Sequence, residues 1–593
     1  MSSAQRSADR LDLLCDNGFL GATDVAITRR LVRLTGAHVP DDAQLGAALA
    51  IRAVRSGSTC LALNRIPETI AGEPDLAALV PTPDVIAESL AESVLVQGSA
   101  NGPLRPLVLA ESVDGPLVYL RKYHQQEAIV RAVLELRGTS RPTTEDAEVA
   151  AVVDEVFGTP TGPVEEDLQR QAALMAATNW TLVVAGGPGT GKTYTVARIL
   201  AVLDRLSGGT ARIGLCAPTG RAAAQLQAAV SADSAAPDSV HAVTVHSLLK
   251  WYPGGRPKFG PSNKLPFDVV VVDETSMLSM TAMSKLLEAL RPDTRLVLVG
   301  DPHQLASVDA GAVLADLVER AETEPAPPVI TLRRGYRFGG DISRVAEAIN
   351  RGDADAVVDL VTDPAIADVT LIAPDDLDRV RELVEPWGAN MRDAARAGDT
   401  QEALDALDAH RVLCAHREGA WGVGGWSRRI VDWLADLPGP RAAVLDSVTR
   451  YPGQPLLVTA TDRQLGTFNG DCGVVVRDAT QPERADALRV VFRRGTELTA
   501  LHPSRLADVI PVYAMTIHRS QGSQFDAVTV VLPPPGSELL TRELLYTAIT
   551  RAKTRVQIVG DVEVLRAAVH RRVQRASGLR SPIRVLDPTG APG

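Results

Sequence analysis

One loop constrains the fold of this chain more than any other part of its sequence. Its eight residues match the pattern GxxxxGK[ST] and are Gly186, Gly187, Pro188, Gly189, Thr190, Gly191, Lys192 and Thr193. An apolar run at 181–185 precedes the loop, and apolar residues at the spacing of one helix face follow it at 196–203. A strand, a glycine-rich turn and a helix in this order surround a phosphate group with backbone N–H groups. The loop therefore predicts a nucleotide site, with Lys192 on the β- and γ-phosphates and Thr193 on a magnesium ion.

Strand-like apolar runs alternate with helical patterns from Trp180 onward. The first set lies at 181–185, 213–217, 269–272, 296–299 and 329–332, and the second at 412–415, 456–459, 527–532 and 556–559. Such alternation is typical of parallel sheets that are covered by helices. We therefore expect an α/β protein with two similar cores, the first over residues 166–350 and the second over 351–576.

The other segments are predicted from their composition and turn residues. Residues 1–115 show helical patterns and predict a mostly helical N-terminal domain, which a linker region at 116–165 joins to the first core. The linker is polar after Gly138, and we expect that part to be flexible. Turn residues and aromatics at 250–267 predict a projecting hairpin, and β-like runs at about 466–508 predict a small β-barrel insertion. The tail, 577–593, is rich in Gly, Pro and Arg and is predicted to be mobile.

Two acids and an amide follow consecutive strands of the first core. Asp273 and Glu274 come directly after the valines at 269–272, and Gln304 lies in the turn after the next strand. The carboxyl edge of the sheet places these side chains beside the phosphate loop. We expect Asp273 to bind magnesium, Glu274 to polarise the attacking water and Gln304 to sense the γ-phosphate.

Composition narrows the class of protein. The formal net charge of −11 does not indicate a nucleic-acid binder, although it leaves room for a local basic groove. The five cysteines lie far apart and form no CxxC pair, which argues against zinc, iron–sulfur and disulfide sites and fits a reducing cytosol. No apolar run approaches the roughly 18 to 20 residues that cross a bilayer, and the N-terminus is not a secretory signal. We expect a cytoplasmic protein without a membrane partner.

Further strings resemble the superfamily-one DNA helicases, and in particular the RecD family of the RecBCD helicase–nuclease. The similarity covers about 167 to 560, and its sharpest marker after the phosphate loop is AMTIHRSQGSQF at 514–525. The other strings are LQRQA at 168–172, APTGRAA at 217–223, TVHSLL at 244–249, DETSM at 273–277, YRF at 336–338, CAHREG at 414–419, GTFNGD at 466–471 and YTAITRA at 546–552. Arg519 and Gln524 depart from the usual Lys and Glu of the family, and the second departure removes a charge.

This resemblance implies two RecA-like P-loop cores that bind ATP and Mg²⁺ between them. It implies that Gln169 contacts the adenine base, and that Arg337 and Arg551 reach the γ-phosphate. Arg551 comes from the second core, so that closure of the cleft and chemistry are coupled. It also implies DNA contacts from six residues, which are Pro218, Thr219, His246, Thr516, His518 and Gln521. Trp251, Tyr252 and Phe259 are equally expected to part a duplex or to pack in the core.

The function and the partners that the resemblance implies follow from the same family. The resemblance implies an ATP-dependent DNA helicase that moves 5′ to 3′ on single-stranded DNA and acts on duplex ends. It also implies assembly with RecB-like and RecC-like subunits. The strings PLVL at 106–109 and LVYL at 117–120 resemble the segment that docks on RecC, and we find no helix–hairpin–helix repeats of the stand-alone helicases. A stand-alone helicase and a non-motor regulatory ATPase remain alternatives. Nuclease activity is not expected, because no acid stands two residues before any of the seven lysines.

Overall fold

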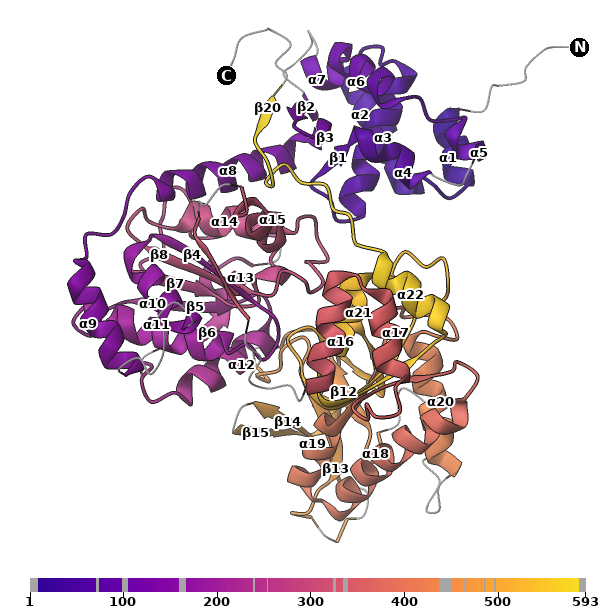
Figure 1. The fold of residues 1–593 in the computed structure, drawn as a ribbon. Coiled ribbons are helices and arrows are strands. Elements are labelled where there is room, and N and C mark those ends of the chain that lie inside the picture. The colour runs from indigo at the N-terminus through magenta and orange to yellow at the C-terminus, as the bar shows by residue number, and fades with distance from the viewer. Residues whose placement is uncertain are drawn as a thin grey trace, which may run out of the picture.

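Two α/β cores and a mainly helical N-terminal domain make up the molecule (Figure 1). The computed structural model describes residues 9–70, 74–98, 105–158, 167–237, 240–252, 254–323, 327–333, 340–436, 450–462, 464–481, 483–484, 487–494 and 497–585. Each core is built on a parallel sheet with helices on its faces, and a third, antiparallel sheet extends from the second core. This architecture confirms the predicted fold class.

The N-terminal domain packs helices against a small antiparallel sheet. Its helices are α1 (Arg10–Asp16), α2 (Ala22–Thr35), α3 (Asp41–Arg55), α4 (Ile66–Thr69), α5 (Pro74–Ala77), α6 (Pro83–Glu92) and α7 (Val94–Gln97), with a 3-10 turn η1 (Leu63–Arg65). Its strands are β1 (Cys60–Ala62), β2 (Leu107–Ser112) and β3 (Gly115–Leu120), and β20 (Ile583–Val585) completes the order β1-β3-β2-β20. Leu45 and Leu90 from the helices and Val118 from the sheet share one buried cluster.

The first core contains six parallel strands in the order β6-β5-β7-β8-β4-β9. The strands are β4 (Thr181–Gly186), β5 (Ile213–Ala217), β6 (Ala242–Thr244), β7 (Val269–Val272), β8 (Arg295–Gly300) and β9 (Val329–Leu332). The helices are α8 (Arg121–Gly138), α9 (Asp146–Phe157), α10 (Leu168–Thr178), α11 (Lys192–Leu206), α12 (Gly220–Ser231), α13 (Val245–Leu248), α14 (Met280–Ala289) and α15 (Val313–Arg320), with η3 (Thr275–Met277). Because β4, β8 and β7 are neighbours, the three loops that follow them meet at one edge of the sheet.

The strand of four valines shows why this sheet is buried on both sides. Val269 and Val271 pack in the cluster that contains α11, whereas Val270 and Val272 pack in the cluster that contains α14. Successive side chains of a strand point to opposite faces, so a continuous apolar run suits a sheet with helices on both faces. The sequence predicted this arrangement correctly.

The second core has five parallel strands in the order β10-β19-β18-β11-β17. They are β10 (Val369–Ile372), β11 (His410–Cys414), β17 (Ala514–Thr516), β18 (Phe525–Val531) and β19 (Ala552–Val559). The helices are α16 (Gly340–Arg351), α17 (Ala354–Thr362), α18 (Leu377–Ala397), α19 (Thr400–Ala409), α20 (Val423–Asp436), α21 (Arg542–Ile549) and α22 (Val562–His570), with η5 (Ile517–Ser520). No helix in the described part of the chain is long and apolar enough to span a membrane.

The predicted β-barrel is an open sheet in the structure. Strands β12 (Pro455–Val458), β13 (Cys472–Arg477), β14 (Leu488–Arg494), β15 (Glu497–Leu501) and β16 (Val509–Pro511), with η4 (Pro503–Arg505), form an antiparallel sheet of order β15-β14-β13-β12-β16. Its two edge strands do not pair with each other in the described residues, so no barrel closes. The prediction of a parallel core strand at 456–459 was also wrong, because these residues belong to β12, whose partners are both antiparallel.

Several segments between the domains are more ordered than their composition indicated. The predicted linker, 116–165, contains part of β3, then α8 and α9. In α9, Val149, Val153 and Val156 recur at helical spacing and pack on the first core, a pattern that the surrounding Thr, Pro and Gly residues obscured. The predicted hairpin at 250–267 has no named strand in its described residues, only an isolated bridge between Gly260 and Asn263.

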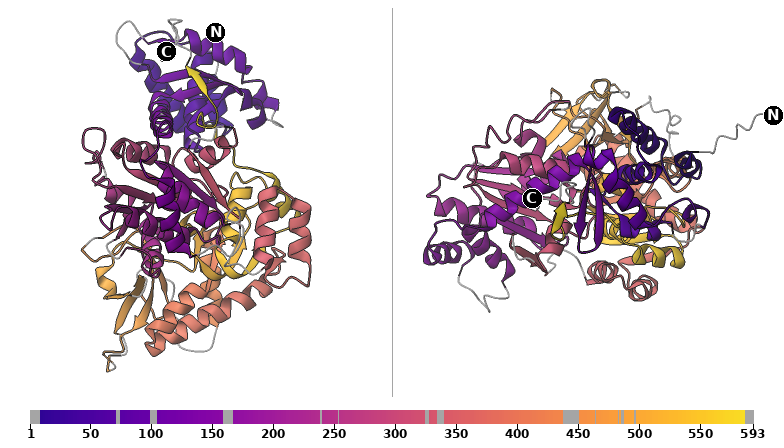
Figure 2. Two further views of the ribbon diagram at one scale, coloured as in Figure 1. Left: turned by 60° about the vertical axis from the view of Figure 1, so that its left-hand side comes forward. Right: turned by 90° about the horizontal axis from the view of Figure 1, so that it is seen from above.

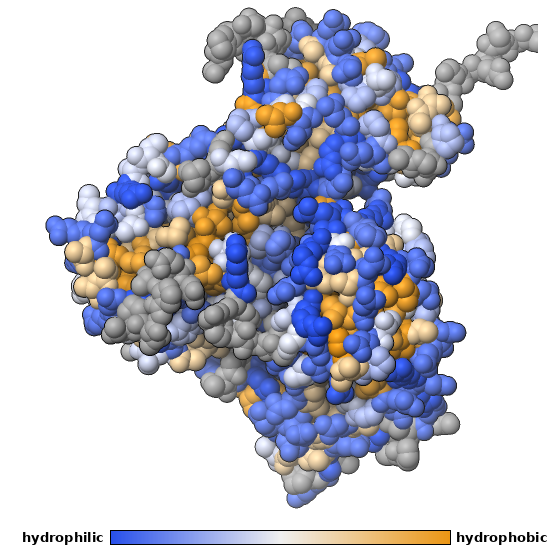
Figure 3. Space-filling view, in the orientation of Figure 1, coloured by the Kyte–Doolittle hydropathy of each residue, from blue (hydrophilic) through white to orange (hydrophobic). Residues whose placement is uncertain are grey.

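The described part of the tail that was predicted to be mobile, residues 577–585, runs between domains and contacts them. After α22 the chain leaves the second core, passes the first core and pairs β20 with β2 (Figures 1 and 2). A hollow of about 500 Å³ lies where this segment passes between the N-terminal domain and the second core, and strongly hydrophilic residues edge it (Figure 3). Composition did not reveal this connection because single apolar residues such as Leu579, which is fully buried, anchor it.

Candidate active site between the two cores

The phosphate loop connects β4 to α11 at the edge of the first sheet. Gly191 adopts a left-handed conformation (φ +85°) directly before α11 begins at Lys192. At Gly186 the loop closes so tightly that a Cβ atom would lie 2.7 Å from Thr190 Oγ1. Lys192 Nζ donates hydrogen bonds to Gly186 O at 2.7 Å and Gly187 O at 2.8 Å, which fixes the ammonium over the loop. The glycines thus form a cradle that larger residues would fill.

The two predicted acids stand at the end of β7. Asp273 Oδ1 accepts a hydrogen bond from the Glu274 backbone N–H at 2.8 Å. Glu274 has φ +51°, an unusual conformation for a residue other than glycine, and such strain is typical of functional sites. Burial raises the pKa of the Asp273 carboxyl well above its ordinary value, and the charge of Glu274 adds to this, whereas the charge of Lys192 opposes it. The strand therefore delivers two carboxyls to one corner of the cavity.

Asp301, which follows β8, is a buried carboxylate that organises the turn containing Gln304. Its Oδ1 accepts from the backbone N–H of His303 at 3.0 Å, and its Oδ2 accepts from Gln304 Nε2 at 3.1 Å. A third donor, the hydroxyl of Tyr546 at 3.0 Å, comes from α21 of the second core. Gln304 is thus held by an acid that both cores share.

Two further hydrogen bonds join the cores at the same turn. The backbone N–H of Leu305 donates to Thr547 Oγ1 at 2.8 Å, and Gln521 Nε2 donates to Leu305 O at 2.8 Å. We call the five residues Asp301, Leu305, Gln521, Tyr546 and Thr547 the inter-core bridge. All of these contacts are buried, so a movement of one core against the other must change them.

Arg551 lies two residues after the end of α21 and is almost completely buried. Its Nε donates to Thr547 O at 3.1 Å and its Nη1 to Ser523 O at 3.3 Å. Burial lowers the pKa of the guanidinium, while the charges of Glu274 and Asp301 act in the opposite direction. Within the described residues no carboxylate forms an ion pair with Arg551, so its positive charge is available to an anion in the cavity.

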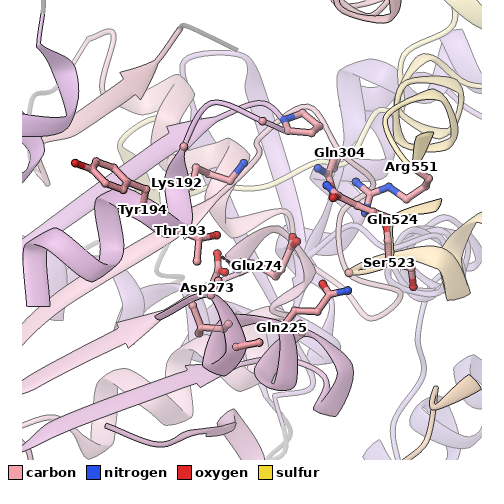
Figure 4. Close-up of a pocket in the computed structure, with 18 of the residues that line it drawn as sticks. Lys192, Thr193, Tyr194, Gln225, Asp273, Glu274, Gln304, Ser523, Gln524 and Arg551 are labelled. Atoms are coloured by element: carbon pink, nitrogen blue, oxygen red, sulfur yellow. Dashed lines mark hydrogen bonds between the residues drawn. The ribbon is translucent and has the colours of Figure 1, made fainter. Parts of the chain in front are cut away.

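A cavity of about 860 Å³ collects these groups between the cores, a size within the roughly 300 to 1,000 Å³ of small-molecule sites. Its lining comprises Gln169, Pro188, Gly189, Gly191, Lys192, Thr193, Tyr194, Ala222, Gln225, Leu226, Ala228, Ala229, Asp273, Glu274, Gln304, Gly522, Ser523, Gln524 and Arg551. In Figure 4 the side chains of Lys192 and Arg551 point toward each other from opposite sides of the space, with Gln304 between them.

Four of the six residues predicted to contact DNA meet in a second, smaller groove. Pro218, Thr219, His246 and Gln521 line a cavity of about 230 Å³, together with Met277, Leu278, Ser279, Ala282, Ser307, Val308 and Asp309. We call this cavity the strand groove. It crosses the boundary between the cores, since Gln521 belongs to the second core and the other lining residues to the first.

The other two predicted contacts lie outside the lining of the strand groove. Thr516 is buried, and its hydroxyl accepts from the Arg519 backbone N–H at 3.3 Å, which caps the turn η5. His518 is half-buried, and burial, followed by the charges of Arg575 and Arg417, lowers its pKa. Both residues therefore support the loop that carries Gln521.

Of the three aromatics in the 250–267 segment, two pack against the first core. Trp251 and Phe259 are partly buried in that cluster, and Trp251 stacks on His246 with ring centroids 4.8 Å apart. Tyr252 has about half of its surface exposed (53%). The packing interpretation therefore holds for Trp251 and Phe259.

Comparisons with known proteins agree with this geometry. The family profile described as AAA domain matches residues 166–370, the UvrD-like helicase C-terminal domain matches 511–559, and the N-terminal domain of RecBCD enzyme subunit RecD matches 16–113. The RecBCD enzyme subunit RecD of Mycobacterium tuberculosis is 44% identical over 576 residues, which cover 95% of each chain.

The chain belongs to the RecD family.

Other relatives of this RecD-family chain differ in how much of their own length the match covers. The RecBCD enzyme subunit RecD of Mycolicibacterium smegmatis is 44% identical and covers 95% of this chain and 98% of its own. The ATP-dependent RecD2 DNA helicase of Deinococcus radiodurans is 31% identical and covers 68% of this chain but only 50% of its own. A solved structure of two Pif1 helicases at forked DNA is 18% identical over 67% of this chain with a TM-score of 0.39, a likeness too distant to add to the fold described above.

Sequence reasoning missed part of the cavity that this RecD-family chain forms. Tyr194, Gln225 and Ser523 line the cavity but were not singled out. Tyr194 comes directly after the last residue of the phosphate loop. Its ring is half-exposed and lies beside Arg198, whose Cζ is 5.0 Å from the ring centroid. No motif marks Gln225, because its position depends on how α12 faces the cleft. Arg337, which was predicted to reach the γ-phosphate, lies outside the described residues.

The residues of this RecD-family site fit a nucleoside triphosphate and a magnesium ion. The glycine cradle, the ammonium of Lys192 and the guanidinium of Arg551 suit an anion of high charge. The hydroxyl of Thr193 and the carboxyl of Asp273 line the same cavity, and oxygen ligands are those that Mg²⁺ prefers. The site can therefore bind a triphosphate between groups from both cores.

Proposed function

We propose that this RecD-family chain is an ATP-dependent DNA helicase that translocates on single-stranded DNA as the motor subunit of a RecBCD-type complex. In this role it acts on duplex ends in double-strand break processing and recombinational repair. The observation that supports the proposal most directly is the shared cavity, in which the first core supplies Lys192, Asp273 and Glu274 and the second supplies Arg551. A site divided in this way couples hydrolysis to the relative movement of two bodies.

Each group of the site has a defined part in hydrolysis. Lys192 binds the β- and γ-phosphate oxygens, and Thr193 and Asp273 would hold Mg²⁺, which would neutralise negative charge of the phosphates. Glu274 orients the attacking water and accepts its proton. Arg551 donates to the γ-phosphate, where negative charge develops as the phosphoryl group leaves. Gln169 at the cavity wall reads the adenine base.

The inter-core bridge connects this chemistry to the DNA strand. Gln304 and Tyr546 share Asp301, so a change at the γ-phosphate reaches the contact between the cores. Gln521 takes part in both the bridge and the lining of the strand groove. Closing the cleft therefore alters the grip on the strand, and the contacts to the phosphate backbone tolerate any sequence.

The relatives indicate the assembly in which the motor works. Proteins named RecBCD enzyme subunit RecD match almost the full length of this chain, whereas it spans half of the RecD2 helicase. This favours the subunit of a complex over the stand-alone helicase. We further propose that RecB-like and RecC-like subunits bind it, with the N-terminal domain docking on the latter, that it moves 5′ to 3′, and that it acts in the cytoplasm.

ATP turnover with and without oligo(dT) tests the motor. We expect single-stranded DNA to stimulate turnover of the wild-type chain, and Lys192→Gln to abolish it because the phosphates lose their cation. Lys285→Gln is the matched control, since Lys285 forms a solvent-accessible ion pair with Glu288 on α14, and such pairs contribute little. The proposal is contradicted if oligo(dT) does not change the rate of ATP turnover by the wild-type chain.

Strand polarity and partners need a second assay. Unwinding is measured on duplexes with a 5′ or a 3′ single-stranded tail, first with the chain alone and then with RecB- and RecC-like subunits. We expect the duplex with the 5′ tail to be unwound preferentially. We also expect Lys192→Gln to abolish the contribution of this subunit to unwinding by the complex. Equal unwinding of both tails by a complex in which only this motor is intact contradicts the proposed direction.

A further inference from the structure

The segment after α22 forms a connection that touches all three parts of the molecule. We call residues 571–585 the C-terminal strap. It pairs with β2 through β20, and Ala576 exchanges hydrogen bonds with the N-terminal domain, from its N–H to Ser58 Oγ at 3.1 Å and from the Thr59 N–H to its carbonyl at 3.0 Å. Arg580 Nε forms an ion pair at 2.8 Å with the buried Asp316 of the first core. The strap therefore carries the chain from the second core to the other two parts (Figures 1 and 2).

Arg575 is a strap residue that bonds to the loop lining the strand groove. Its Nη1 donates to Ser307 O at 2.7 Å, to Gly311 O at 3.1 Å and, with a longer contact of 3.4 Å, to Asp309 O. These three carbonyls belong to one loop, 307–311, so a single guanidinium fixes its curvature. The charge-assisted hydrogen bonds that an arginine makes are stronger than those between neutral groups.

The loop at 307–311 is part of the strand groove and adjoins the inter-core bridge. Ser307, Val308 and Asp309 line the groove opposite Gln521, and Val308 is 78% exposed. Leu305, which makes two of the bridge contacts, lies two residues before the loop. A displacement of this loop would therefore change the surface that faces the strand.

The N-terminal domain also contacts both the 307–311 loop and Arg575. Gly57, directly after α3, accepts a hydrogen bond from the Gly311 N–H at 2.9 Å. A Cβ atom on Gly57 would lie 2.6 Å from Arg575 Cζ, so the backbone of the N-terminal domain packs directly on the guanidinium. Arg575 is thus clamped between the N-terminal domain and the loop that it holds.

We propose that Arg575 is a positioning residue that holds the 307–311 loop in its strand-binding form and connects that loop to the N-terminal domain. The inference rests on the proposed function, because it concerns the grip on single-stranded DNA. Within the described residues, Arg575 makes its side-chain hydrogen bonds to the 307–311 loop and none to the lining of the nucleotide cavity, so the loop carries its effect to the strand. A partner that moves the N-terminal domain would reach the strand groove through this contact.

The test compares three variants of the full chain, alone or in its complex if only the complex is active. They are Arg575→Gln, Arg575→Lys and the control Arg572→Gln, whose exposed side chain in the same strap makes only a 3.9 Å ion pair with Glu543. We measure the oligo(dT) concentration that gives half-maximal stimulation, the KM for ATP, and amide hydrogen exchange in a peptide that spans 306–311.

We expect Arg575→Gln to raise the half-maximal oligo(dT) concentration by about tenfold or more, with the KM for ATP unchanged and faster exchange in the 306–311 peptide. Arg575→Lys should recover part of the affinity, because an ammonium can reach some of the carbonyls, and Arg572→Gln should match the wild type. The inference is overturned if Arg575→Gln matches Arg572→Gln, or if its KM for ATP rises in parallel with the oligo(dT) requirement. A wild-type chain that oligo(dT) does not stimulate would instead refute the proposed function, so the two failures are distinguishable.

Discussion

At the scale of single residues, the proposed hydrolysis in the cavity depends most on the buried guanidinium of Arg551. The guanidinium is held by two backbone carbonyls, which orient it without neutralising its charge. A preorganised cation in a desolvated site acts on charge that develops in the transition state, where it is worth more than in water. This arrangement differs from that of Arg170, whose guanidinium is paired with Asp154 and Asp167.

We expect Arg551→Gln to lower DNA-stimulated ATP turnover by about 10²- to 10³-fold, because one donor to the developing charge is lost. Arg551→Lys should not restore turnover, since an ammonium cannot make both carbonyl contacts and also reach a phosphate. Steady-state turnover at saturating oligo(dT) measures the effect, and Arg170→Gln serves as a control for a buried arginine outside the cavity. Turnover within a few-fold of wild type in Arg551→Gln contradicts the assigned role.

The sequence identified the residues of the site whose chemistry is local. Lys192, Thr193, Asp273 and Glu274 follow buried strands, and the carboxyl edge of a parallel sheet brings such residues together without further information. Tyr194 and Gln225 could not be found in this way, because nothing in a helix pattern tells which face meets a cleft between two domains. Gln521 was predicted to contact DNA, and the structure shows a hydrogen bond from it to Leu305 O across the cores that the sequence did not indicate.

At the scale of secondary-structure elements, the contact of α21 with the turn after β8 forms the joint between the cores. Tyr546 lies one residue before Thr547 on this helix, so a single element supplies two of the bridging contacts and ends two residues before Arg551. A rotation of α21 therefore displaces Arg551 and both bridge residues together. Rigid helices are suited to this kind of coupling because they move as units.

We expect Tyr546→Phe to reduce the factor by which oligo(dT) stimulates turnover by about tenfold, because the hydroxyl no longer donates to the buried Asp301 carboxylate. The ratio of turnover with and without oligo(dT) is the measurement. Tyr451→Phe is the matched control, since it removes a hydroxyl contact of 2.9 Å with Tyr513 inside the second core. Equal ratios in the two variants would show that the bridge does not transmit the signal.

Secondary-structure elements were predicted correctly where the apolar periodicity is regular. The predictions failed where the pairing of a strand depends on partners far away in the chain. Five of the six strands of the first core were placed within about one residue, because both faces of that sheet are buried, whereas the short edge strand β6 was not predicted. The run at 456–459 is equally apolar, yet it pairs with β13 and β16 in an antiparallel sheet. Periodicity indicates burial but not the direction of the neighbouring strand.

At the scale of the whole molecule, three parts meet around the carboxyl of Glu127 on α8. It accepts hydrogen bonds from Thr59 and Tyr119 of the N-terminal domain, with the Tyr119 hydroxyl at 3.0 Å, and from the strap through Ser577 Oγ at 3.2 Å. Burial raises the pKa of Glu127 to about 7, and the charge of Asp316 adds to the rise, whereas the hydrogen bonds from Thr59 and Tyr119 oppose it. The carboxyl therefore binds a proton in the folded protein at a pH where the unfolded chain releases it.

The sign of the resulting pH dependence follows directly. Stabilisation from Glu127 is complete below its unfolded pKa of 4.5 and is lost as the pH rises through about 7. The shift corresponds to about 3 kcal/mol in the free energy of unfolding. We expect Glu127→Gln to flatten the decline of Tm between pH 5 and pH 8, as roughly set by these pKa values. The control Glu148→Gln, at an exposed position on α9, should keep the wild-type slope, and an unchanged slope in Glu127→Gln would contradict the role of this carboxyl.

The division into two cores was predictable from the sequence, whereas the way in which the parts are tied together was not. Each core has its own strand and helix pattern, but the strap is held by single groups such as Leu579 and Arg580, whose partners are hundreds of residues away in the chain. Local patterns carry no information about contacts of this kind. For this reason the prediction of a mobile tail missed the contacts that its described residues, 577–585, make with the rest of the molecule.

The pairing of β20 with β2 also dictates the order in which the polypeptide can mature. Ribosomes deliver the N-terminal sheet first, but one edge of β2 cannot acquire its last neighbour until residues 583–585 have been synthesised. During translation that edge is exposed, and unpaired edges invite wrong associations. A chain released early would keep its nucleotide-binding motifs and still lack the final strand, so the N-terminal sheet is complete only after the whole second core has been synthesised.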